Sequence, residues 1–167
     1  MSIVTVDECQ LVPEDFNRIL SAVLEFCQEK GYSFYHKKSH EGLLRHLIIR
    51  YGVRTGELLV NIVTSSQGEF DDKGFTEMIT ALELDNRVVG VLRTVNDRLA
   101  DAVYCEELKV LWGRDYYMEK IMGLDFKVSA FSFFQTNVEA AERLYTEAID
   151  LIDDFEDKNV FDLYCGT

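Results

Sequence analysis

Hydrophobic residues recur along this chain at two different spacings, and each spacing predicts one type of secondary structure. In residues 13–30 the apolar side chains lie three or four positions apart, which predicts an amphipathic helix. Pro13 suits the first position of that helix, and Gly31 suits the position just after its end. The same spacing predicts a second helix over residues 74–84.

Strands are predicted where Leu, Ile and Val are concentrated in short runs between turn residues. The N-terminal residues 1–12 are expected to be extended, because Ile3, Val4 and Val6 favour a strand. The other predicted strands cover residues 43–51, 57–65, 87–96, 107–112, 116–122 and 124–131. Together these elements predict an α+β fold, in which two helices pack on a mostly antiparallel sheet.

The hydrophobic pattern changes character near Ser132. A third amphipathic helix is predicted from Thr136, where Thr136 and Glu139 fit a capping box, and an apolar strand follows it at the end of the chain. We therefore divide the chain into a central α+β domain, residues 1–131, and the beginning of a second domain, residues 132–167.

The net charge of −13 argues against strong RNA binding by this chain alone, because phosphate contacts require a cationic surface. The charge is nevertheless uneven. Residues 30–54 hold six Lys or Arg against one acidic residue, whereas residues 139–158 hold eight acidic residues against two basic ones. The acidic run is interpreted as the solvated side of the third helix. For Arg45, His46 and Arg50 two interpretations stay open, an exposed charged sheet face and a phosphate-contacting surface.

Composition argues against several other classes of protein. At 167 residues and 47% hydrophobic content, the chain can bury a substantial core. It has no apolar run of transmembrane length and no signal-peptide pattern, so we expect a cytoplasmic protein without a membrane partner. The four cysteines show no CxxC spacing and predict neither a zinc site nor a disulfide framework.

Two motifs in the last third of the chain carry more specific information. They are Phe133-Phe134-Gln135-Thr136-Asn137 and Asp162-Leu163-Tyr164-Cys165-Gly166. A glycine directly after an apolar strand lets a ligand approach the backbone, as in many nucleotide and cofactor sites. At these residues the sequence resembles the RNA uracil-C5 methyltransferases that use S-adenosylmethionine. In that family an aromatic-x-Gln-x-Asn segment precedes a helix, and a strand ending in Asp-x-Tyr/Phe-Cys-Gly opens the methyltransferase domain.

The resemblance runs through the whole chain, including Val6-Asp7-Glu8-Cys9 and Gly42-Leu43-Leu44-Arg45-His46-Leu47. It implies that residues 132–167 are the first helix and strand of a truncated Rossmann-like methyltransferase domain. It also implies that the full enzyme methylates C5 of a uridine, with 23S rRNA as the expected target and transfer RNA as the alternative. We interpret the chain as a fragment whose unpaired final strand could promote dimerisation.

The resemblance also assigns roles to individual residues. Gln135 and Tyr164 correspond to residues that contact S-adenosylmethionine, and Asp162 and Gly166 correspond to residues that shape the cofactor loop. Phe133 is expected near the flipped target base. The alternatives are core packing for Phe133 and Tyr164 and a polar residue at the start of a helix for Gln135.

No catalytic residue is expected within this chain. In the family the cysteine nucleophile and the general base follow the second motif at a distance, beyond Thr167, so the chain alone is expected to be inactive. Cys165 corresponds to the cofactor-loop cysteine. Some family members hold a 4Fe-4S cluster, and Cys9 corresponds to the fourth ligand of that cluster. Since three further cysteines would lie upstream, we expect no cluster in this chain; the alternative for Cys9 is a small buried hydrophobic residue.

Two other functions compete with the enzyme fragment. The antiparallel sheet could be a non-catalytic module that binds RNA or protein. A different Rossmann-like methyltransferase, acting on a small molecule or a protein, is a weaker alternative, because the sequence around Cys9 and the long sheet domain count against it.

Overall fold

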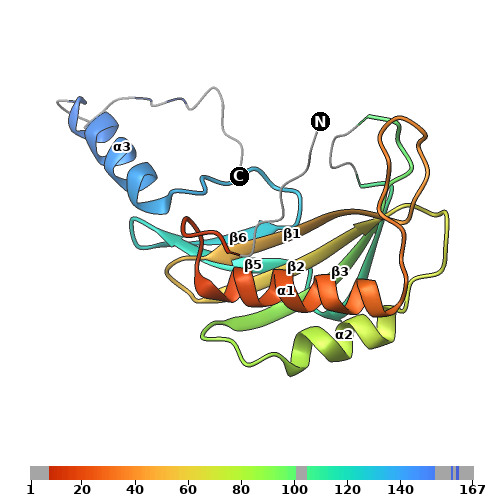
Figure 1. Ribbon diagram of the computed structural model, residues 1–167. Coiled ribbons are helices and arrows are strands. Elements are labelled where there is room, and N and C mark those ends of the chain that lie inside the picture. The colour runs from red at the N-terminus through yellow and green to blue at the C-terminus, as the bar shows by residue number, and fades with distance from the viewer. Residues whose placement is uncertain (1–7, 101–104, 153–158, 160, 162–167) are drawn as a thin grey trace.

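The computed structural model describes residues 8–100, 105–152, 159 and 161 (Figure 1). The helices of this part of the chain are α1 (Glu14–Glu29), α2 (Asp72–Ala81) and α3 (Val138–Asp150). Its strands are β1 (Leu44–Gly52), β2 (Glu57–Thr64), β3 (Arg87–Val95), β4 (Glu107–Gly113), β5 (Tyr116–Ile121) and β6 (Leu124–Ser129). The predicted α+β fold is confirmed. The strand predicted over residues 1–12 lies mostly outside the described residues.

The main sheet contains four strands in the order β1-β2-β3-β4, and β5 and β6 form a separate two-stranded hairpin. Strand β2 pairs antiparallel with β1, and β3 pairs antiparallel with β4. The central pair β2–β3 is parallel, because the chain crosses over through α2 before it returns to the sheet. The described sheets are therefore mostly antiparallel, as the sequence predicts.

The main sheet is covered on both faces. Helices α1 and α2 lie side by side on one face, and β5 crosses β1, β2 and β3 on the other (Figure 1). Each face has its own apolar core. The helix side includes Ile19, Phe26, Leu58, Val60, Phe75 and Ile79; the hairpin side includes Leu59, Leu92, Tyr117 and Val128. Strand β2 is buried at every position for this reason.

The helix ends follow local sequence only in part. Helix α1 begins directly after Pro13 and ends before Gly31, whose φ of 67° is the left-handed value that glycine accepts without strain. Helix α2 begins at Asp72, because the Asp71 side chain accepts a 2.8 Å hydrogen bond from the Gly74 amide. It ends at Ala81 and not at residue 84, since Leu82 adopts an extended conformation and packs against the core.

A buried carboxylate joins α1 to the loop before β3. Asp15 is 1% exposed, and it accepts hydrogen bonds from the Asp85 amide at 2.9 Å and the Asn86 amide at 2.8 Å. Burial alone would raise the pKa of Asp15, but these hydrogen bonds and the Arg18 charge outweigh it. The pKa therefore lies below its ordinary value of 3.8.

The depressed pKa of Asp15 makes its contribution to stability pH-dependent. Ionised Asp15 stabilises the fold above the unfolded-state pKa, near 3.8, and this contribution is lost as the pH falls through the lower folded-state pKa. We expect Asp15→Asn to lower the free energy of unfolding at pH 7 by about 1–3 kcal/mol. Urea unfolding at pH 7 and pH 3 measures the difference. A gap between wild type and variant that stays the same at both pH values would contradict the prediction; Asp125→Asn, at an exposed site, is the control.

No helix within the described residues combines the length and apolar character needed to cross a bilayer.

Candidate functional site

The segment that follows β6 carries the first motif, and its two neighbouring aromatic residues differ in exposure. Phe134 is partly buried and packs against Phe126, with ring centroids 5.8 Å apart. Phe133 is 73% exposed. Core packing is therefore wrong as an interpretation of Phe133, and its side chain lies where an external aromatic group could reach it.

The polar residues of this motif lead into α3. Asn137 is the N-cap residue, and its Oδ1 accepts a 2.9 Å hydrogen bond from the Ala140 amide. The predicted capping box that starts at Thr136 is thus wrong by one residue. The Asn137 side chain explains the shift, because it satisfies an amide of the first turn that would otherwise lack a partner within the helix.

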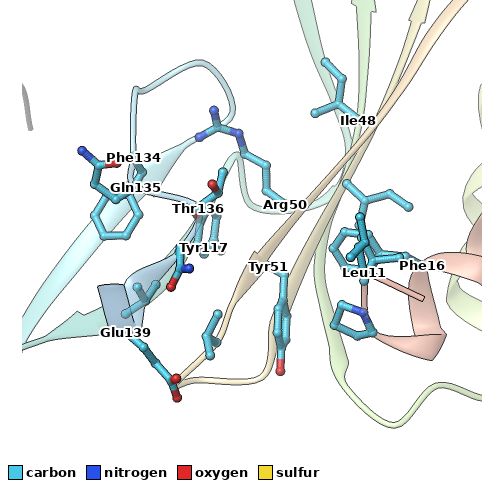
Figure 2. Close-up of a pocket in the computed structure, with 16 residues that line it drawn as sticks. Leu11, Phe16, Ile48, Arg50, Tyr51, Tyr117, Phe134, Gln135, Thr136 and Glu139 are labelled. Atoms are coloured by element: carbon cyan, nitrogen blue, oxygen red, sulfur yellow. The ribbon is translucent and has the colours of Figure 1, made fainter. Parts of the chain in front are cut away.

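A pocket of about 710 Å³ lies beside this motif. It is lined by the chain around Leu11 and Phe16, by the C-terminal half of β1, by Tyr117, and by residues 134–139 (Figure 2). Its wall combines aromatic rings with polar groups that include Arg50 and Gln135. Such a mixture can hold an organic ligand that carries both apolar and charged parts.

Arg50 and Tyr117 set the electrostatics of the pocket. The Arg50 Nη1 donates to the Ser129 carbonyl at 3.1 Å and the Ser132 carbonyl at 2.7 Å. Burial raises the pKa of Tyr117 above its ordinary value of 10.0, and the nearby Arg50 charge offsets this only in part. Tyr117 is consequently a neutral phenol at physiological pH.

Of the residues expected to bind the cofactor, Gln135 lines this pocket and is exposed. Its carboxamide can both donate and accept hydrogen bonds. Tyr164, Asp162 and Gly166 lie outside the described residues, so their roles stay predictions.

Cys9 is exposed, so its interpretation as a small buried residue is wrong. Its amide donates to Asn17 Oδ1 at 2.9 Å, and its carbonyl accepts from Asn17 Nδ2 at 3.3 Å. These bonds tie the segment before α1 to the helix. Among the described residues, no three His, Cys, Asp or Glu side chains lie close enough to hold a metal ion.

The basic residues of β1 contact backbone carbonyls from distant parts of the chain. The Arg45 Nη1 donates to the Asn96 carbonyl at 2.9 Å and the Arg98 carbonyl at 2.8 Å, and its guanidinium lies 4.1 Å from the centre of the Tyr35 ring. Arg50 makes equivalent contacts to Ser129, the last residue of β6, and to Ser132 after it. These arginines therefore fix loops, a role that neither of the two sequence-based interpretations included.

Helix α3 is joined to the β1–β2 and β5–β6 turns through Glu142. Its carboxylate accepts from the Met122 amide at 2.9 Å and from Arg54 Nη2 at 2.9 Å, and these two interactions hold the pKa of Glu142 below its ordinary value. Glu142 is thus an exception to the prediction that the acidic run is solvated. Beyond Ala141 the apolar side of α3 is exposed, with Leu144 at 63% and Ile149 at 44%.

Similarity to known proteins agrees with this geometry. No family model matches the chain. It is 48% identical over 167 residues to an uncharacterised RNA methyltransferase of Caldanaerobacter subterraneus, and 47% identical over 165 residues to one of Clostridium tetani. These alignments cover 99% of this chain, but 37% and 36% of the relatives.

Among solved structures, the tRNA (uracil-54, C5)-methyltransferase of Pyrococcus abyssi, in complex with S-adenosyl-L-homocysteine, superposes with a TM-score of 0.74. The sequences are 28% identical, and the match covers 92% of this chain and 36% of that one. The resemblance deduced from the sequence is thereby confirmed: this chain is similar to RNA methyltransferases over nearly all of its own length and spans a little over a third of theirs.

Proposed function

We propose that this chain forms part of an S-adenosylmethionine-dependent enzyme that methylates C5 of a uridine in RNA. The observation that carries the proposal is the placement of the first motif. Gln135 lines a pocket of about 710 Å³, and Phe133, two residues away, is 73% exposed on the same segment. The likeness to a tRNA (uracil-54, C5)-methyltransferase with bound S-adenosyl-L-homocysteine supports this reading.

The residues of the first motif would bind and orient the cofactor and the target base. Gln135 would hydrogen-bond the cofactor, which supplies the methyl group when bound, and Phe133 would stack on the target base after it leaves the RNA helix. Tyr164, Asp162 and Gly166 would complete the cofactor loop. C5 of uracil is a poor nucleophile, so the reaction also needs a thiolate that adds to C6 and a base that removes the C5 proton. We assign neither role to a residue of this chain.

We propose ribosomal RNA, and specifically 23S rRNA, as the target. Transfer RNA is the alternative, and the activity of the Pyrococcus abyssi enzyme favours it. Cys9 stays a proposed fourth ligand of an iron–sulfur cluster that the whole enzyme would complete with three further cysteines.

Disruption of the gene in its source organism tests this function. We expect the 5-methyluridine content of 23S rRNA to fall, as measured by mass spectrometry of nucleosides from separately purified 23S rRNA and transfer RNA. Loss from transfer RNA alone would support the methyltransferase and reassign its substrate. Unchanged 5-methyluridine in both RNA pools would contradict the proposal and favour a non-catalytic binding module.

A further inference from the structure

We propose that Arg50 and Arg54 are positioning residues that clamp the segment carrying Phe133 and Gln135 against the sheet domain. The inference rests on the proposed function, in which this segment meets the cofactor and the target base. It assigns to the two arginines a role in the orientation of the site.

Arg50 holds the beginning of the segment. It lies in β1, yet one nitrogen of its guanidinium reaches two carbonyls that lie 79 and 82 residues later in the sequence, those of Ser129 and Ser132. Figure 2 shows the Arg50 side chain extending from the strand toward the chain that leads to Phe134. The hydroxyl groups of Ser129 and Ser132 lie 2.7 Å apart and close the same turn. The position of Ser132, directly before Phe133, therefore depends on Arg50.

Arg54 holds the end of the segment. It lies in the turn between β1 and β2, and its Nη2 is 2.9 Å from Glu142 Oε2 in the second turn of α3. The other carboxylate oxygen of Glu142 accepts from the Met122 amide at 2.9 Å. Glu139 Oε1, 4.0 Å from Arg54 Nη1, adds a second negative charge. The start of α3 is consequently joined to the turns of two hairpins.

The turn that carries Arg54 is itself held in place by a buried carboxylate of β5. Glu119 of β5 is fully buried, and its carboxylate accepts from the Val53 amide at 2.5 Å and the Arg54 amide at 3.0 Å. These bonds hold the Arg54 backbone in place, so its side chain extends from an ordered turn. An isolated exposed ion pair contributes little to stability, but one that joins two rigid elements can fix their relative orientation.

The stretch between Ser132 and α3 is mostly exposed. Gln135 and Thr136 are exposed, the ring of Phe134 packs against Phe126, and burial resumes at Val138 in the first turn of α3. A segment of this kind would lose conformational entropy when a ligand binds, unless it is already ordered. Anchors at both ends reduce that loss, so we expect them to strengthen cofactor binding by ordering the segment before the ligand arrives.

Hydrogen exchange measured by NMR on the 167-residue chain tests the clamp. The variants are Arg50→Gln, Arg50→Lys and Arg54→Gln. The control is Arg87→Gln, which removes an arginine paired with Glu57 at 2.7 Å but away from the segment. We expect the Ser132 amide to exchange roughly 5- to 30-fold faster in Arg50→Gln, and the Met122 amide similarly faster in Arg54→Gln. Arg50→Lys retains a charged donor and is expected to fall between wild type and Arg50→Gln.

A titration with S-adenosyl-L-homocysteine, followed on the Gln135 side-chain amide, separates positioning from general stability. We expect the affinity to fall roughly 5- to 30-fold in Arg50→Gln, while the midpoint of thermal unfolding stays within about 2–4 °C of wild type. If the Ser132 and Met122 amides exchange at the wild-type rate in all variants, the proposed role of the two arginines is contradicted, whatever the titration shows. If exchange changes as expected but the wild type does not bind S-adenosyl-L-homocysteine, the clamp is supported and cofactor binding by this chain alone is contradicted.

Discussion

Replacing Glu119 with alanine is expected to lower the free energy of unfolding by about 3 kcal/mol or more. Its fully buried carboxylate accepts from three amides, those of Val53, Arg54 and Lys120, at 2.5, 3.0 and 2.7 Å. Each donor left without a partner in a poorly hydrated site costs about 1–3 kcal/mol. The residue therefore stabilises the contact between the β1–β2 turn and the β5–β6 hairpin.

Urea unfolding of Glu119→Ala at pH 7 measures this loss. Asp125→Ala is the matched control, because Asp125 is an acidic residue of the neighbouring strand whose pair with Lys120, at 3.5 Å, is exposed. We expect that control to change stability by about 0–1 kcal/mol. Equal effects of the two substitutions would show that the Glu119 hydrogen bonds contribute little.

Replacing Phe75 with alanine is expected to cost about 3–5 kcal/mol, since truncation of a buried aromatic ring leaves a cavity that the core fills only in part. Phe75 is fully buried in α2, and its ring centroid lies 5.9 Å from that of Phe26 and 5.4 Å from that of Phe70. The substitution thus removes the contact by which α2 joins α1 on the sheet.

Phe34→Ala is the control for this prediction, because the same change is made at a side chain that is 62% exposed. Thermal and urea unfolding are expected to show a large loss for Phe75→Ala and a change within about 0.5 kcal/mol for Phe34→Ala. A loss below 1 kcal/mol at Phe75 would mean that α2 contributes little to the core.

The local pattern of the sequence was sufficient to predict where most elements lie. Helix α1 and both hairpins appear where apolar spacing and turn residues place them. The reason is that periodicity and turn chemistry act over a few residues, and Gly31 and Gly123, with φ of 67° and 80°, mark turns that need no distant contact. The errors are at helix ends, where Leu82 packs against the core and Asn137 caps α3 through its side chain.

The candidate site was predictable in part. Resemblance to a family pointed to Gln135 and Phe133, but no periodic signal marks Arg50, Arg54 or Glu119 as partners of distant groups. An arginine on a strand looks the same in sequence whether its guanidinium meets a phosphate or a backbone carbonyl. Only the folded chain brings Arg50 to the Ser129 and Ser132 carbonyls.

The amino-acid sequence alone thus established the α+β class, the approximate positions of its helices and strands, and the kinship with RNA methyltransferases. Tertiary structure decided that β2 and β3 pair in parallel, that the β5–β6 hairpin covers the second face of the sheet, and that α3 is held through Glu142. Contacts of this kind join residues that are far apart in the chain. Their energies depend on the simultaneous placement of both partners, and no local pattern encodes that placement.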